Sequence, residues 1–173
     1  EGTNEINRML SVGMLIKKAM KGHVDLLGPA SKVQEELMGI PSFETPDYSE
    51  LFAEEKELLG KLKKAFLMVA GGAVQKYGMD LDHHQQLLTA AADMLIEIYM
   101  AESTVLRTEK LAKSQGEDKV QEQIAMAKLY LYKAVDIISQ KGKESIISFA
   151  EGDEQRMMLM GLRRFTKYTN MPN

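Results

Sequence analysis

Apolar side chains recur along most of the chain three and four residues apart, the spacing that places them on one face of an α-helix. This pattern predicts three long helices over residues 47–78, 81–114 and 117–141. The most regular row belongs to the second of them: Leu87, Ala91, Met94, Ile98, Ala101, Val105, Thr108 and Ala112. A flanking row widens that stripe beyond two positions per heptad, which is typical of a globular bundle and not of a two-stranded coiled coil: Leu88, Ala92, Leu95 and Tyr99.

Capping signals divide the rest of the chain into shorter pieces. A first helix is expected from Thr3 or Asn4, both good N-caps, to Gly22, with an apolar row at Ile6, Met9, Gly13, Ile16 and Met20. The D-x-x-E pair Asp47 and Glu50 predicts where the first long helix starts, and Lys141 and Gly142 predict where the third one ends. Further short helices are predicted over 29–38, 144–150 and 153–168.

These elements predict an all-α protein, an antiparallel up-and-down helical bundle with extra short helices. We expect three parts: a first helix in 1–22, a connector with a short helix in 23–46, and a helical bundle domain in 47–173. Leucine, methionine and alanine outnumber valine and isoleucine by 48 to 18, and no proline lies between residues 47 and 171. Both features favour helices over strands.

Charge and composition narrow the function. The net charge is −3 with no block of like charges, so a nucleic-acid partner is not expected. The absence of cysteine excludes disulfides, thiolate metal sites and thiol catalysis. No apolar run reaches the roughly 20 residues needed to cross a bilayer, which predicts a soluble intracellular protein.

Three other patterns favour a structural role. Bundle di-metal sites need E-x-x-H pairs, and the chain has only Asp80 and His83 at that spacing, so no metal site is expected. The pair Gly71-Gly72 lacks the Lys-Ser/Thr of a phosphate loop and predicts close helix packing. The lysine cluster Lys61, Lys63 and Lys64 is interpreted as a solvated face. The 13 methionines, among them Met157, Met158 and Met160, are interpreted as core filling in preference to a pliable binding surface.

The first eight residues, Glu-Gly-Thr-Asn-Glu-Ile-Asn-Arg, place a carboxylate before a helix N-terminus, where free N–H groups face any nearby anion. This segment resembles the acyl-CoA dehydrogenases, whose last catalytic-domain helix opens with E-G-T-x-x-I-x-R. The helical residues that follow resemble the C-terminal domain added in the very-long-chain type. The resemblance implies that 1–22 is the last helix of the catalytic domain and that 47–173 is an appended bundle.

The resemblance assigns roles to individual residues. Glu1 falls on the catalytic base, which removes the α-proton of a fatty acyl-CoA thioester while the β-hydride passes to FAD, the α,β-dehydrogenation of β-oxidation. Glu1 and Gly2 are the implied substrate-binding residues, and Thr3, Asn4 and Glu5 the implied FAD contacts. Arg8 is expected to form a structural ion pair. The remaining parts of the enzyme are not in this sequence, so we expect a C-terminal fragment that is inactive alone.

The resemblance also implies a homodimer and an electron transfer flavoprotein as electron acceptor. The expected location is the cytoplasm of a bacterium, or the mitochondrion in a eukaryote. Membrane attachment, which the added domain assists in mitochondrial relatives, has little support because the connector has no basic amphipathic run. The alternative function is a stand-alone helical adaptor or oligomerisation module whose motif match is accidental.

Overall fold

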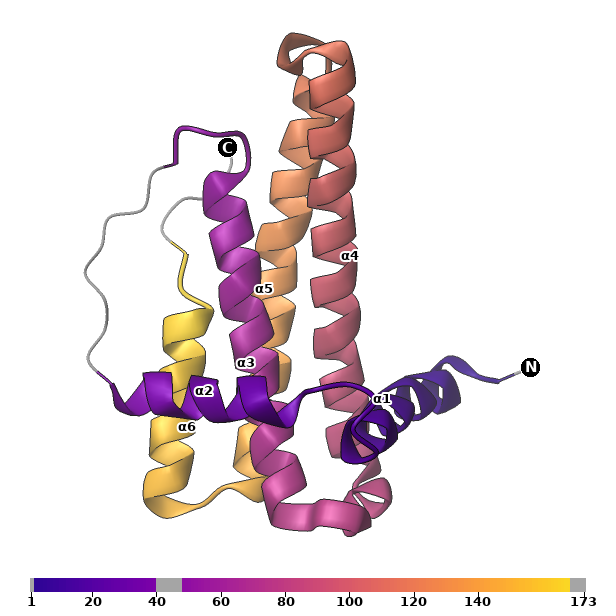
Figure 1. Ribbon diagram of the computed structural model, residues 1–173, viewed down its shortest axis with the longest axis vertical. Helices are drawn as coiled ribbons and strands as arrows, with labels where there is room; N and C mark the ends of the chain where they lie inside the picture. The colour runs from indigo at the N-terminus through magenta and orange to yellow at the C-terminus, as the bar shows by residue number, and fades with distance from the viewer. Residues whose placement is uncertain (1, 40–47, 169–173) are drawn as a thin grey trace.

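The computed structural model describes residues 2–39 and 48–168, except for the side chain of Met79, and these residues form helices and no strands (Figure 1). The α-helices are α1 (Asn4–Met20), α2 (Leu27–Met38), α3 (Ala53–Tyr77), α4 (Gln85–Gln115), α5 (Gln121–Phe149) and α6 (Gly152–Phe165). Two short 3-10 helices join neighbours in the bundle: η1 (Gly78–His83) and η2 (Glu117–Lys119). The predicted all-α class is confirmed.

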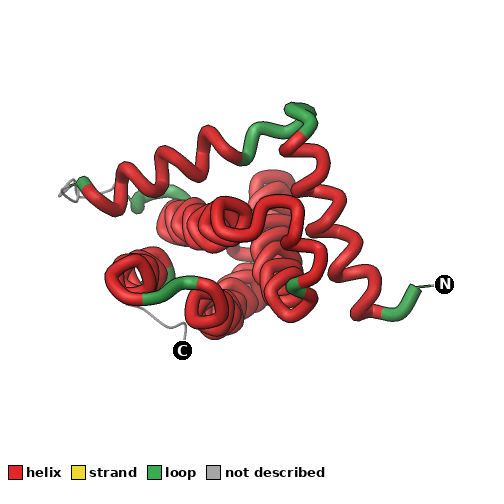
Figure 2. Tube along the Cα trace, turned by 90° about the horizontal axis from the view of Figure 1, so that it is seen from below, coloured by secondary structure: helices red, strands yellow, loops and turns green. Residues whose placement is uncertain are grey.

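Helices α3, α4 and α5 run alternately in opposite directions, and α6 returns beside α3 and α5 (Figure 1). Viewed from the end, α1 and α2 lie along one side of this four-helix bundle (Figure 2). Helix α2 crosses α3, whereas α1 packs against the lower part of α4 and its N-terminus points away from the bundle. The predicted antiparallel up-and-down bundle with additional helices is therefore confirmed.

The main apolar row predicted for residues 87–112 lies in the core, whereas Tyr99 of the predicted flanking row is 67% exposed. Every member of the α4 row is buried, and so is every member of the corresponding row that leads into and along α5: Val120, Ile124, Ala127, Leu131, Ala134 and Ile138. Gly116, with a φ of 92°, provides the left-handed turn between the two helices that a residue with a Cβ rarely adopts. The three-four spacing therefore brings these faces together across one interior.

The predicted start of the first long helix was wrong. Helix α3 begins at Ala53, after a turn in which the Ala53 amide donates to the Glu50 carbonyl at 3.1 Å. Phe52 occupies the left-handed region with a φ of 63°, at a cost of about 1–2 kcal/mol for a residue with a side chain. Its ring is buried, which is worth about 1.5–3 kcal/mol and offsets that cost. Asp47 lies outside the described residues.

The predicted start of the second long helix and the predicted end of the third were also wrong. Helix α4 starts at Gln85 and not at Leu81, because η1 occupies the preceding residues. Helix α5 continues through Gly142 to Phe149, so the separate helix predicted over 144–150 is its last part. Gly142 is buried, and a Cβ there would lie 2.8 Å from Leu162 Cδ1 of α6. This glycine thus accommodates a neighbouring helix and does not end its own.

Helix α1 has the predicted cap, and the middle of its predicted row faces the bundle: Gly13 is buried, and Met9 and Ile16 are partly buried against the core. Thr3 Oγ1 accepts a hydrogen bond from the Ile6 amide at 3.5 Å, as expected for an N-cap. The most buried side chain is Val12, which the predicted row omitted, and the two ends of that row, Ile6 and Met20, are exposed. Helix α2 ends at Met38 as predicted and starts at Leu27, two residues before Pro29.

The predicted packing role of the glycine pair is confirmed. A Cβ on Gly71 would lie 3.1 Å from Ala30 of α2, and one on Gly72 would lie 2.9 Å from Met158 of α6. Met158 is buried, as core filling predicts, but Met160 is exposed, so that interpretation was wrong for Met160.

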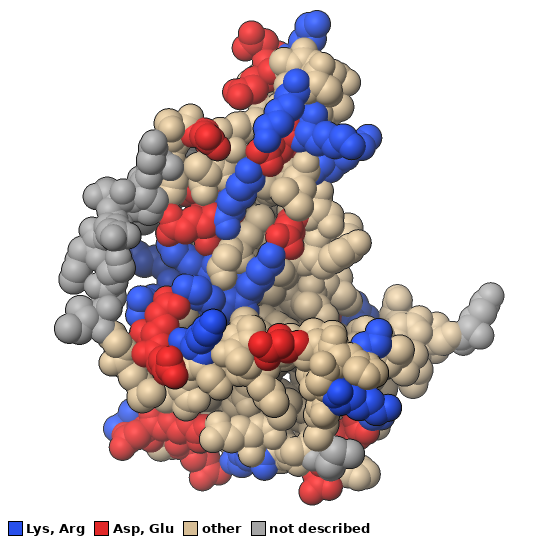
Figure 3. Space-filling model, in the orientation of Figure 1, with Lys and Arg blue, Asp and Glu red and all other residues tan. Residues whose placement is uncertain are grey.

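The lysine cluster of α3 pairs with surface carboxylates. Lys61, Lys63 and Lys64 approach Glu57, Glu102 and Glu36 within 2.7 Å or less, and the last two pairs connect α3 to α4 and α2. Acidic and basic side chains are interspersed over the face shown in Figure 3. This arrangement agrees with the predicted solvated face. Exposed pairs of this kind contribute little stability each.

Candidate functional site

The residues that the motif selects lie at the projecting end of α1. Thr3, Asn4 and Glu5 are all exposed there, and so is Gly2, whose carbonyl accepts a hydrogen bond from Asn7 Nδ2 at 3.2 Å. Glu1, the predicted base, lies outside the described residues. The described part of the motif is thus a capped helix start that presents polar groups to its surroundings.

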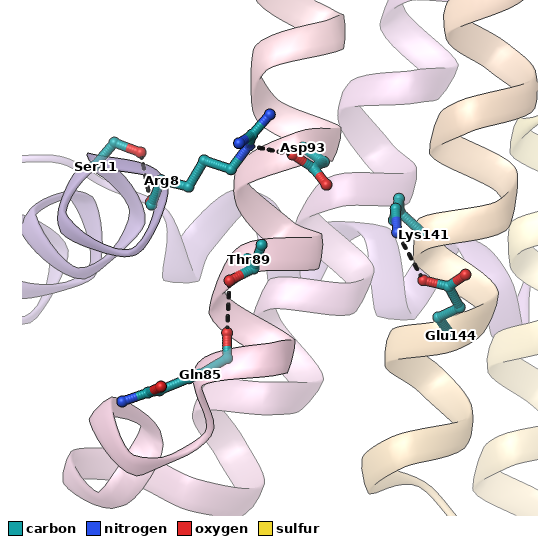
Figure 4. A network of polar contacts seen from close by, with 7 residues as sticks. All are labelled: Arg8, Ser11, Gln85, Thr89, Asp93, Lys141 and Glu144. Atoms are coloured by element: carbon teal, nitrogen blue, oxygen red, sulfur yellow. Dashed lines mark hydrogen bonds and ion pairs between the residues drawn. The ribbon is translucent and has the colours of Figure 1, made fainter. Parts of the chain in front are cut away.

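Arg8 forms the structural ion pair that was expected of it. Its Nε lies 2.7 Å from Oδ1 of Asp93, a residue of α4 that is 85 positions away in the sequence (Figure 4). The side chains retain 36% and 23% of their exposure, so the pair is partly shielded from water. Ser11 Oγ donates to the Arg8 carbonyl at 2.8 Å on the same helix. The motif is therefore attached to the bundle through a charged contact.

A cleft of about 590 Å³ opens between the first half of α1 and the α4–α5 pair. Glu5 and Met9 of α1 form one wall, and the opposite wall consists of residues of α4 and α5: Gln85, Gln86, Leu87, Thr89, Ala90, Asp93, Lys141, Glu144, Ser145 and Ser148.

Local contacts hold the polar side chains of the far wall (Figure 4). Lys141 Nζ donates to Glu144 Oε2 at 3.0 Å, and Gln140 Nε2 donates to Glu144 Oε1 at 2.9 Å. These hydrogen bonds, the one from Lys141 above all, lower the pKa of Glu144. Thr89 Oγ1 donates to the Gln85 carbonyl at 2.8 Å. The far wall thus carries paired charges and satisfied hydroxyl groups.

The described residues contain no group of three or more acidic or histidine side chains that could hold a metal ion. His84, which directly follows His83 of the D-x-x-H pair, stacks on Tyr77 with ring centroids 3.6 Å apart. Within the same residues, no helix is both long and apolar enough to span a bilayer.

Sequence reasoning missed Asp93, Lys141 and Glu144 as neighbours of the motif. Asp93 does carry a signal, because it is the single acidic residue between Gln86 and Ile96, in a segment otherwise composed of small and apolar residues. That signal marks a charge that needs a partner, but it does not say that the partner is Arg8.

Residues 61–164 match the family model described as "Acyl-CoA dehydrogenase, C-terminal domain". This chain belongs to the acyl-CoA dehydrogenase family. The first eight residues lie outside the matched range, and the roles that the resemblance assigns to them stay predictions. The matched range lies within 47–173, while the three-part division of the chain stays a prediction.

Two relatives within the acyl-CoA dehydrogenase family cover nearly the whole chain. A "Probable acyl-CoA dehydrogenase" of Bacillus subtilis (strain 168) is 41% identical over 169 residues, which is 98% of this chain and 28% of that protein. The crystal structure of an acyl-CoA dehydrogenase complexed with FAD from Bacillus anthracis is 43% identical, with a TM-score of 0.90 over 99% of this chain and 29% of that one. The chain therefore spans less than a third of the length of these relatives.

Proposed function

We propose that this chain is the C-terminal part of an FAD-dependent acyl-CoA dehydrogenase of the very-long-chain type, which introduces an α,β double bond into fatty acyl-CoA thioesters in β-oxidation. The observation that carries the proposal is the family membership of the chain together with a complete E-G-T-x-x-I-x-R motif at residues 1–8. The chain covers only 28–29% of the length of its relatives, which supports a longer parent enzyme.

The start of α1 fits a role in holding FAD. A cofactor with many polar groups needs exposed donors and acceptors, and Thr3, Asn4 and Glu5 offer them next to the amide groups of a helix N-terminus. Gly2 has no side chain that would obstruct a close approach. The Bacillus anthracis relative is complexed with FAD. When bound, FAD would accept the hydride from the β-carbon of the substrate.

In this proposal the chain supplies the proton chemistry. The Glu1 carboxylate removes the α-proton, which is only weakly acidic, so the thioester carbonyl must be polarised at the same time. The backbone N–H of Glu1 would donate to that carbonyl oxygen and stabilise the negative charge that develops there. Gly2 lets the substrate lie close to the backbone. A fragment with these residues alone would be inactive.

The test uses the full-length enzyme with Glu1→Gln and, as a matched control, Glu35→Gln at an exposed position of α2. Glu1→Gln should retain the yellow flavin but lose turnover of acyl-CoA and bleaching of the flavin under anaerobic conditions by at least about 100-fold, because general-base catalysis typically contributes 10²–10⁴. Glu35→Gln should match the wild type. Full activity of Glu1→Gln would refute the assignment of the base.

The proposed cofactor contact has a separate test. Asn4→Ala in the full-length enzyme should lower the fraction of FAD that stays bound through gel filtration, measured by absorbance at the flavin band. The comparable exposed amide of α2, Gln34→Ala, should leave this fraction unchanged. Equal flavin retention in both variants would contradict a role for Asn4.

The partners and the location complete the proposal. We infer a homodimer and an electron transfer flavoprotein as electron acceptor, because the motif resembles enzymes with these properties. Light scattering of the full-length protein tests the dimer, and reduction of purified electron transfer flavoprotein tests the acceptor. The bacterial relatives support a cytoplasmic enzyme. Flotation with liposomes tests membrane attachment, for which we expect no bound protein.

A further inference from the structure

The first half of α1 has no fully buried side chain among the described residues. The buried residues of α1, Val12 and Gly13, lie in the middle of the helix. Ahead of them, Ile6 and Leu10 are 53% and 55% exposed, and the cleft separates this half of the helix from the walls of α4 and α5. Within the part of the chain that the structure describes, this half of the helix is connected to the bundle by Met9, which is partly buried against the core, and by one charged contact at the edge of that cleft.

The Arg8–Asp93 pair is this charged contact. The backbone at Asp93 is held in place by the core, because its neighbours Ala92 and Met94 are both 0% exposed. The separation of 2.7 Å is that of a charge-assisted hydrogen bond, which is roughly twice as strong as a neutral one. Among the described residues, α1 forms a second ion pair, between Lys17 and Asp82, which lies beyond Val12 at the opposite end of the helix, is 3.2 Å long and is largely exposed.

A small tilt of α1 would move its start considerably. At a rise of 1.5 Å per residue, the eight steps from Val12 back to Asn4 span about 12 Å, so a tilt of about 5° about Val12 displaces the helix start by about 1 Å. A displacement of that size can slow a reaction about 100-fold, because proton transfer needs close and aligned partners.

We infer that Asp93 is a positioning residue for proton abstraction: through Arg8 it holds the start of α1, the helix that directly follows the proposed base Glu1 in the sequence. The bundle would then take part in the reaction without touching the substrate. The inference rests on the proposed function, because it requires Glu1 to be the base.

The test compares three variants of the full-length, FAD-loaded enzyme: Asp93→Asn, which removes the charge; Asp93→Glu, which keeps it; and Asp82→Asn, which removes the second ion pair of α1. Asp93→Asn should lower the rate constant of anaerobic flavin reduction at saturating acyl-CoA about tenfold or more, while flavin content and the Kd for acyl-CoA change less than about twofold. Asp93→Glu should retain most of the rate, and Asp82→Asn should stay within about twofold of the wild type.

An isotope effect separates positioning from a general loss of structure. With acyl-CoA deuterated at the α-carbon, the isotope effect on flavin reduction should increase in Asp93→Asn, because the slower step is proton removal. A wild-type rate and isotope effect in Asp93→Asn, or an equal loss in Asp82→Asn, would overturn the inference alone. A wild-type enzyme that no acyl-CoA reduces would overturn the proposed function and the inference with it.

Discussion

Lys128 Nζ of α5 lies 2.9 Å from Oε1 of Glu55 in the first turn of α3, and the two side chains differ sharply in exposure, 35% for the lysine and 4% for the glutamate. The carboxylate is thus the buried member of the pair, and it also lies where the N-terminal dipole of α3 favours negative charge. The lysine, by contrast, can reach water if its partner is lost.

This asymmetry predicts unequal effects of removing either partner. Lys128→Met should lower the free energy of unfolding by about 3 kcal/mol, because it leaves a buried charge without a partner. Glu55→Gln should lower it by only about 1 kcal/mol, because the remaining lysine can be solvated. Urea unfolding followed by circular dichroism measures both. Equal losses would contradict the assignment of Glu55 as the buried member.

Two glycines of α3 should respond to alanine with opposite signs. A Cβ on Gly72 would lie 2.9 Å from Met158 and 3.0 Å from the ring of Phe149, so Gly72→Ala should lower stability by about 1–3 kcal/mol through overpacking. No atom of the described residues lies within 4 Å of a Cβ on Gly60, so Gly60→Ala should raise stability by about 0.5–1 kcal/mol through helix propensity. Thermal unfolding of the two variants provides the measurement.

Tyr130 should remain protonated beyond the range of an ordinary tyrosine. Burial, and then the hydrogen bond that its hydroxyl donates to Glu97 at 2.9 Å, raise the pKa of Tyr130 from 10.0 to about 12. The neutral phenol is favoured in the folded state, so this contribution to stability is complete below pH 10 and is lost as the pH rises through about 12.

Absorbance of tyrosinate measures this shift. In a titration of the folded protein between pH 9 and 12.5, Tyr130→Phe should remove absorbance from the late part of the curve and leave the early part intact. A loss from the early part in Tyr130→Phe would contradict the raised pKa.

Glu109 should contribute to acid sensitivity. Hydrogen bonds from Lys113, first, and from Lys56 lower the pKa of Glu109, and the latter pair connects α4 to α3 at 2.8 Å. Because the pKa is lowered in the folded state, the stabilisation is present above the ordinary pKa of a glutamate and is lost as the pH falls through the folded value.

Glu109→Gln should therefore be less stable than the wild type at pH 7, by no more than about 1 kcal/mol for a surface pair, and the difference should disappear toward pH 3. Urea midpoints at several pH values between 3 and 7 measure it. A difference that persists at low pH would show that the lost interaction is not ionic.

The sequence alone determined the helices, the antiparallel bundle and the motif at its start. Apolar residues at steps of three and four must share one face of a helix, so the buried row from Leu87 to Ala112 could be read from the chain without knowledge of its neighbours. The cap at Thr3 is equally local, because a hydroxyl and an amide three residues apart meet within one turn.

Only the tertiary structure decided what depends on residues that are distant in the chain. Lys141 followed by Gly142 is a pattern typical of a helix end. The side chain of Leu162 nevertheless occupies the space that the missing Cβ of Gly142 leaves, and α5 continues. The buried ring of Phe52 likewise outweighs a local start signal. Arg8 needed a carboxylate, but its choice of Asp93 follows from the packing of α1 on α4, because a charge selects its partner by distance in space and not by position in the sequence.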